Sequence, residues 1–111
     1  MICDAGDVVV VPFPFSEIAV AKPRPAEVVS PESVNRAETN TLLAMLTTAA
    51  GEGRPGDVRL LDLRDAGLTS ACVMRLKLFS LANRLISRRI GALSARDREA
   101  AKAAVSGLIA L

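Results

Sequence analysis

The stretch Gly6-Asp-Val-Val-Val-Val-Pro-Phe-Pro-Phe15 contains four consecutive valines followed by alternating proline and phenylalanine. A branched Cβ carbon favours extended backbone, because it packs well on a pleated surface. The run therefore predicts a buried strand beginning at Val8. Proline cannot donate a hydrogen bond to a central ladder, so we expect the strand to stop at Pro12 and Pro14.

Two further strands are expected downstream. The segment Arg24-Pro-Ala-Glu-Val-Val-Ser30 predicts a second strand, entered from a loop at residues 16–22 through the rigid Pro23-Arg24-Pro25 unit. The segment Leu42-Leu-Ala-Met-Leu-Thr-Thr48 is apolar and ends on two hydroxyl residues, which is typical of a strand, although a helix is the alternative. Between these two segments, Pro31 to Thr41 is interpreted as a polar connection.

The centre of the chain is less regular. We expect a loop from Ala49 to Gly56, partial strand alternation over Asp57 to Leu63, a turn at Asp65-Ala-Gly67 and a short strand over Ser70 to Leu76. The segment Leu78 to Ile90 mixes apolar and basic residues without a period, so it predicts no particular element.

The last segment predicts a helix. Ser94-Ala-Arg-Asp97 resembles an N-cap with an acid at N3, and Ala101, Val105 and Leu108 follow on one face. Strands followed by one terminal helix indicate an α+β fold, a small, strongly bent sheet or barrel closed by that helix. The length of 111 residues matches one domain, residues 1–111.

Composition limits the setting in which the protein acts. Apolar residues make up 50% of the chain and the mean hydropathy is +0.34, so we expect a second copy to cover apolar surface in a homodimer. The longest apolar stretch is less than half of the roughly 20 residues that cross a bilayer. Met1 to Asp7 lacks the basic start of a secretory signal. These features predict a cytoplasmic protein with no membrane association.

Several chemistries have no basis in the residues. The chain has no histidine and no tyrosine, and its net charge of +2 is too small to indicate nucleic-acid binding by itself. Gly51 to Gly56 matches no nucleotide-binding motif, and Asp62 and Asp65 are more typical of solvated or capping acids than of a magnesium site. Cys3 and Cys72 are expected to be buried or idle thiols. We therefore expect no metal and no cofactor.

A series of short motifs follows in a characteristic order. They are Gly6 to Phe15, Lys22-Pro-Arg-Pro-Ala26, Val28-Val-Ser30, Leu46-Thr-Thr48, Ala66-Gly-Leu68, Val73-Met-Arg75, Leu78-Phe-Ser-Leu81, Leu85-Ile86 and Arg89-Ile-Gly-Ala-Leu-Ser94. This ordered set resembles the MazF/PemK family of type II toxins. The resemblance implies an SH3-like curved antiparallel sheet with a C-terminal helix, a symmetric homodimer and a cognate antitoxin. It also implies metal-independent cleavage of single-stranded RNA in a groove near the dimer seam.

The resemblance also implies site residues. The arginine of the family's Arg-Pro-Ala unit is Arg24, and the hydroxyl that ends its third strand is Thr47 or Thr48, so these are the catalytic candidates. A guanidinium offers a planar fork of donors to two phosphate oxygens, and its flanking prolines reduce the freedom lost on binding. The candidates for substrate binding are Lys22, Phe15 and Glu17; the last is the only acid in the first loop, where some relatives place a functional acid.

Two departures from the family pattern keep other functions open. Glu27 replaces a residue that is usually apolar, and the acid often found between Arg75 and Leu81 is absent. The same fold is used by the CcdB-type gyrase poisons, so a toxin without ribonuclease activity is one alternative. A non-catalytic relative that acts as an interaction module is the other.

Overall fold

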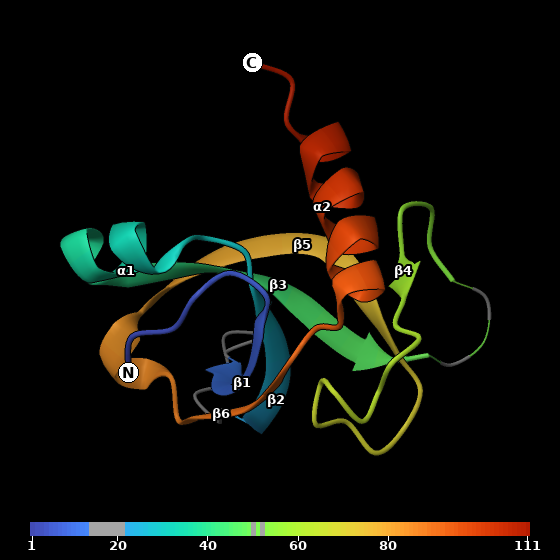
Figure 1. Ribbon diagram of the computed structural model, residues 1–111, viewed down its shortest axis with the longest axis horizontal. Coiled ribbons are helices and arrows are strands. Elements are labelled where there is room, and N and C mark those ends of the chain that lie inside the picture. The colour runs from blue at the N-terminus through green and yellow to red at the C-terminus, as the bar shows by residue number, and fades with distance from the viewer. Residues whose placement is uncertain (14–21, 50, 52) are drawn as a thin grey trace.

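A curled antiparallel sheet with a helix at its C-terminal end forms the molecule (Figure 1). The computed structural model describes residues 1–13, 22–49, 51 and 53–111. In this part of the chain the strand order is β4-β5-β3-β2-β1-β6, and every neighbouring pair is antiparallel. The elements are β1 (Asp7–Phe13), β2 (Lys22–Val28), α1 (Glu32–Glu38), β3 (Asn40–Thr48), β4 (Val58–Arg59), β5 (Cys72–Ala82), the 3-10 turn η1 (Asn83–Leu85), β6 (Arg88–Ala92) and α2 (Ala95–Leu108). The α+β fold predicted from the sequence is confirmed.

The valine-rich strand β1 lies between β2 and β6 in the sheet. Its backbone continues through Pro12 to Phe13, so the expected stop at Pro12 is wrong. The reason is position: β6 pairs with β1 only as far as Val10, whereas Pro12 lies opposite Pro23 of β2. A proline is tolerated where one side of the strand carries no ladder. Pro14 lies outside the described residues.

The segment predicted as a polar connection contains a short helix. Helix α1 starts after Pro31 and ends at Glu38, and its C-cap residue Thr39 adopts the left-handed conformation with φ of 57°. Asn35 is fully buried and its side-chain amide donates to the carbonyl oxygens of Cys3 and Ser30 at 2.9 and 3.0 Å. These tertiary bonds stabilise a helix that is too short and polar to show an apolar period.

The other central segments differ from expectation mainly in length. β3 is a strand, which removes the helix alternative, whereas β4 covers only two residues of the expected strand over Asp57 to Leu63. β5 extends well past Leu76, and the unassigned segment Leu78 to Ile90 forms the end of β5, η1 and most of β6. The turn before β5 is confirmed: Gly67 has φ of +72°, and a Cβ there would collide with the carbonyl oxygen of Ile90.

Helix α2 begins as predicted. The Ser94 hydroxyl caps it by accepting from the backbone nitrogen of Asp97 at 3.3 Å. The Asp97 carboxylate is buried and accepts from the backbone nitrogens of Leu61 and Asp62, which joins the helix to the segment after β4. The predicted apolar face holds for Ala101 and Val105, which pack on the core, but not for Leu108, which is 47% exposed because α2 runs past the sheet (Figure 1).

Apolar side chains gather in two clusters. The first lies where α2 packs on the sheet, and the second contains residues of β1, β2 and β3. Phe79 packs against the second cluster and its ring centroid lies 4.7 Å from that of Phe13, so both partly buried rings lie at the edge of this cluster. Cys3 and Cys72 are buried free thiols, as expected. Neither described helix is long and apolar enough to cross a membrane.

Candidate active site

A pocket of about 530 Å³ opens beside the start of β2 and the end of β3. The predicted catalytic residues Arg24, Thr47 and Thr48 all line it. Its other lining residues come from β1, β2, β3, the segment before β5, the first residue of β5, and β6: Val10, Pro23, Pro25, Met45, Leu46, Gly67, Leu68, Thr69, Ser70, Cys72, Arg88 and Ile90. The fold therefore brings together residues that are more than twenty positions apart in the sequence.

Strand register decides how Arg24 lies relative to the two threonines. β2 and β3 pair Val28 with Leu43 and Ala26 with Met45. Extending the same register by two residues brings Arg24 opposite Thr47. Successive side chains of a strand point to opposite faces, so Thr47 shares the face of Arg24 and Thr48 belongs to the other face. Thr47 is half-buried and Thr48 is exposed.

The backbone around Arg24 is held by pairing with β1 before, at and after the residue. Pro23 lies opposite Pro12, Arg24 opposite Val11, and Pro25 opposite Val10. The two prolines restrict the φ angles on either side of Arg24. Together with the pairing to β1, they fix the position of the Arg24 backbone, from which the side chain extends. Its side chain is exposed at the pocket.

The pocket is basic and rich in hydroxyls. Its described lining residues include two arginines and four hydroxyl side chains, and no carboxylate. Cys72 is in the lining, but burial raises the pKa of its thiol, which keeps the sulfur protonated and weakly nucleophilic. Elsewhere among the described residues no three of His, Cys, Asp and Glu gather as metal ligands do. The arrangement suits binding of a polyanion.

The structure adds residues that the sequence analysis did not select as candidates. Arg88 opens β6 and pairs with Val10 of β1, which places it in the pocket lining, and Ser70 reaches the same pocket from the segment after Gly67. In the sequence Arg88 is one of several scattered cations, and no motif marks Ser70. The pairing of β6 with β1 gives the two neighbouring arginines different surroundings. Arg88 lines the pocket, whereas the guanidinium of Arg89 donates to the Asp7 carboxylate at 2.9 Å.

The predicted substrate-binding residues have different outcomes. Lys22 is exposed and pairs with Phe13 at the end of the β1–β2 ladder, but it does not line the pocket. Phe15 and Glu17 lie outside the described residues, so their predicted roles stay predictions. Asp62, which was weighed as a metal ligand, accepts from Arg96 and from the Ser94 hydroxyl, and the arginine lowers the pKa of that carboxyl to about 2.

Comparison with known families matches residues 4–109 to the model of the PemK-like, MazF-like toxins of type II toxin–antitoxin systems. The chain belongs to this family. Its match spans nearly every element, from the segment before β1 to the end of α2. A comparison with curated proteins found no match.

Solved MazF structures share the fold. A MazE–MazF complex from Deinococcus radiodurans has a chain that is 24% identical, with a TM-score of 0.78 and coverage of 97% of this chain and 96% of that one. The Mycobacterium tuberculosis toxin MazF-mt6 is 22% identical, with a TM-score of 0.73 and coverage of 91% and 93%. A mycobacterial endoribonuclease in complex with its cognate antitoxin is 15% identical, with a TM-score of 0.71 and coverage of 96% and 91%. These likenesses support the PemK/MazF fold along the whole chain.

Proposed function

We propose that this PemK/MazF toxin is a metal-independent endoribonuclease that cleaves single-stranded RNA in the pocket beside β2 and β3. The observation that carries the proposal is the meeting of Arg24, Thr47 and Arg88 in one pocket whose described lining contains no carboxylate. A solved neighbour with the same fold is named an endoribonuclease, which agrees with this assignment.

Arg24 stabilises the charge that builds up during cleavage. When a ribose 2′-hydroxyl attacks the neighbouring phosphorus, negative charge accumulates on the phosphoryl oxygens and on the leaving 5′ oxygen. A guanidinium can donate to two of these oxygens at once, and strand pairing holds the backbone of Arg24 beforehand. A guanidinium keeps its proton at neutral pH, so electrostatic stabilisation is its first role.

We assign the Thr47 hydroxyl to the stabilisation of the same negative charge. It shares a face with Arg24 in the extended β2–β3 register and lines the same pocket. Its hydroxyl can donate to a phosphoryl oxygen while Arg24 holds another. We assign Thr48, whose side chain belongs to the opposite face, and Arg88 to contacts with the RNA backbone at the rim of the pocket.

The nucleophile is supplied by the substrate. The ribose 2′-hydroxyl already lies beside the phosphorus, so holding it in line provides the proximity that a nucleophilic side chain would otherwise supply. The products are then a 2′,3′-cyclic phosphate and a free 5′-hydroxyl. DNA, which lacks this hydroxyl, should bind in the pocket without being cut.

Two partners complete the proposal for a toxin that acts in the cytoplasm. We place an acidic antitoxin segment over Arg24, because a pocket that attracts phosphates also attracts carboxylates. The solved neighbours include a MazE–MazF complex and an endoribonuclease in complex with its cognate antitoxin. We also infer a symmetric homodimer, since large apolar side chains such as Leu61, Leu108 and Ile109 are more than two-fifths exposed in a single chain.

The test is digestion of a defined single-stranded RNA by the purified protein, with and without EDTA. We expect cleavage to survive EDTA and to leave cyclic phosphate ends. Replacing only the 2′-hydroxyl at the cut site with hydrogen should block the reaction while binding persists. Cleavage of that deoxy substrate, or loss of activity in EDTA, would overturn the mechanism. Growth arrest by a protein that leaves RNA intact would favour a gyrase-type protein target instead.

A further inference from the structure

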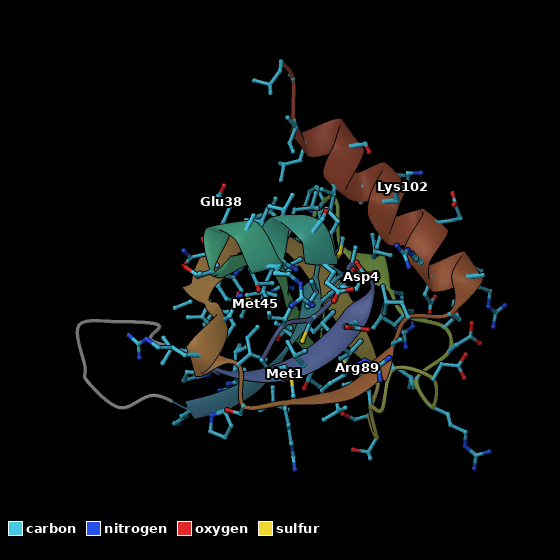
Figure 2. The ribbon with its side chains drawn as sticks, turned by 60° about the vertical axis from the view of Figure 1, so that its left-hand side comes forward. Met1, Asp4, Glu38, Met45, Arg89 and Lys102 are labelled. Carbon is cyan, nitrogen blue, oxygen red and sulfur yellow. The ribbon has the colours of Figure 1, made fainter. Side chains whose placement is uncertain are left out.

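A second groove, separate from the candidate active site, runs between α2 and the sheet. It has a volume of about 370 Å³. Its lining residues belong to the turn before β1, the end of β2 with the residue after it, and α2: Ala5, Gly6, Glu27, Val28, Val29, Arg98, Glu99, Ala101, Lys102, Val105 and Ser106. None of them lines the first pocket. Figure 2 labels Lys102 on α2 and Asp4 in the turn before β1, the two elements that flank this groove.

The floor of the groove contains a carboxyl group with an unmet hydrogen-bonding capacity. Glu27 lies within β2, paired with Val8 on one side and Ala44 on the other, and it is 3% exposed. Its Oε2 atom has no hydrogen-bond partner among the described residues. Buried carboxylates are almost always paired or hydrogen-bonded, because an unpaired buried charge is costly. No described residue supplies a donor to this oxygen, so it is open to a donor from a bound molecule.

The mouth of the groove carries cations. Arg98 and Lys102 are exposed and lie four residues apart, on one face of α2. Arg98 extends across the turn before β1: Gly6 has φ of +92°, and a Cβ built there would lie 3.1 Å from the Arg98 Nη1 atom. The absence of a side chain at Gly6 thus lets the guanidinium lie at the edge of the groove. Besides Glu27, the described lining residues include one other acid, Glu99.

Between floor and mouth the walls are apolar. Val28 and Val29 line one side, and Ala101 and Val105 line the other. A ligand that satisfies every group in the groove thus has a hydrogen-bond donor with positive charge at its inner end, a short apolar stem and an anionic group at its outer end. An alkyl cation alone would leave the mouth cations unused, and a fatty acid would leave Glu27 without a donor.

We propose that this groove binds a small zwitterion, with its ammonium group on Glu27 and its carboxylate between Arg98 and Lys102. Both ends would then make charge-assisted hydrogen bonds, which are stronger than neutral ones. The ammonium would supply the donor that Oε2 lacks. Glu27 and Arg24 both belong to β2, but binding of a zwitterion in this groove does not depend on ribonuclease activity in the other pocket.

Ionisation of Glu27 sets the expected pH dependence of binding. Burial raises the pKa of this carboxyl to about 7, Arg98 opposes the rise, and Asp97 adds to it. Glu99 and Lys102 are the other charged groups of α2 at the groove, and Val8 and Ala44, which pair with Glu27, carry no charge. An ammonium binds the ionised carboxylate, so affinity should rise as the pH increases through neutrality, and binding near neutrality should release a proton.

The test uses three probes on the whole protein: ε-aminocaproate, hexylamine and caproate. Methyl resonances of Val28, Val29 and Val105 report binding by NMR. We expect saturable shifts with ε-aminocaproate in the millimolar range, and at least about tenfold weaker binding of the two single-charge probes, since each loses one charge-assisted contact.

Three variants separate the proposed contacts from general effects. Glu27→Gln should weaken ε-aminocaproate at least about tenfold and abolish the pH dependence, and Arg98→Gln should weaken it several-fold. Glu38→Gln, at an exposed acid on α1 that lines neither pocket, is the matched control and should bind as the wild type does. Thermal unfolding verifies that each variant is folded. Absence of saturable shifts in the wild type, equal binding of caproate, or unchanged affinity in folded Glu27→Gln would each overturn the proposal.

Discussion

Replacing Glu27 by glutamine should change how the stability of the protein depends on pH. The side chain keeps its size but loses its charge. In the wild type, burial beneath α2 raises the pKa of this carboxyl from 4.5 to about 7. The unfolded chain has no such environment, so its glutamate ionises at the ordinary value. Between the two pKa values the folded protein binds more protons than the unfolded chain.

This difference gives the direction and the size of the effect. An acid with a raised folded pKa contributes stability at low pH, and the contribution is lost as pH rises from about 4.5 to about 7. One pKa unit corresponds to about 1.4 kcal/mol, so the free energy of unfolding falls by roughly 3 kcal/mol over this pH range. Above neutrality the contribution of Glu27 no longer changes.

Glu27→Gln should therefore have nearly wild-type stability at acidic pH and exceed the wild type by up to roughly 3 kcal/mol in mildly alkaline buffer. Urea denaturation across this pH range, at one protein concentration so that association does not vary, measures the difference in the free energy of unfolding. Glu99→Gln, an exposed acid on α2, is the control and should differ little. A difference between Glu27→Gln and wild type that is constant with pH, or a wild type more stable in alkaline buffer, would refute the reasoning.

Three further predictions concern the pocket and the fold. Arg24→Ala should reduce RNA cleavage about 10²–10³-fold with unchanged circular dichroism, and Arg24→Lys should restore little, because a point charge cannot bridge two phosphate oxygens; wild-type rates in both would move the site elsewhere. Thr47→Ala should lower the cleavage rate far more than Thr48→Ala, because only Thr47 shares the face of Arg24, so equal losses would contradict the register argument. Asn35→Ala should lower the free energy of unfolding by about 2–4 kcal/mol in urea, because it leaves the buried carbonyls of Cys3 and Ser30 without donors, and a loss below about 0.5 kcal/mol would refute that role.

Local rules were sufficient where an element carries its own signal. The valine run predicted β1, and Ser94 with Asp97 predicted the first turn of α2, because branched side chains and capping hydroxyls act on their own backbone. Arg24 and the two threonines could also be selected in advance, since the order of motifs along the chain resembles the toxin family. Their meeting in one pocket followed from the pairing of strands that these motifs form.

Contacts between distant segments decided the rest. Helix α1 was not predicted because it is stabilised by Asn35, whose side-chain amide donates a hydrogen bond to the backbone of a segment more than thirty residues away. Arg88 was one scattered cation among several until the β1–β6 ladder placed it in the pocket.

The sequence by itself determined strands β1, β2 and β3, the start of the capped helix and the arginine–threonine candidates, because local backbone preferences and motif order act over a few residues. Glu27 illustrates what it could not determine. In the sequence it is one acid in a strand, marked only as a departure from the family. Tertiary structure buried it between two paired strands and beneath α2, where desolvation changes its ionisation and leaves an oxygen without a donor. Burial depends on segments that fold over a residue from elsewhere in the chain, and no local pattern records them.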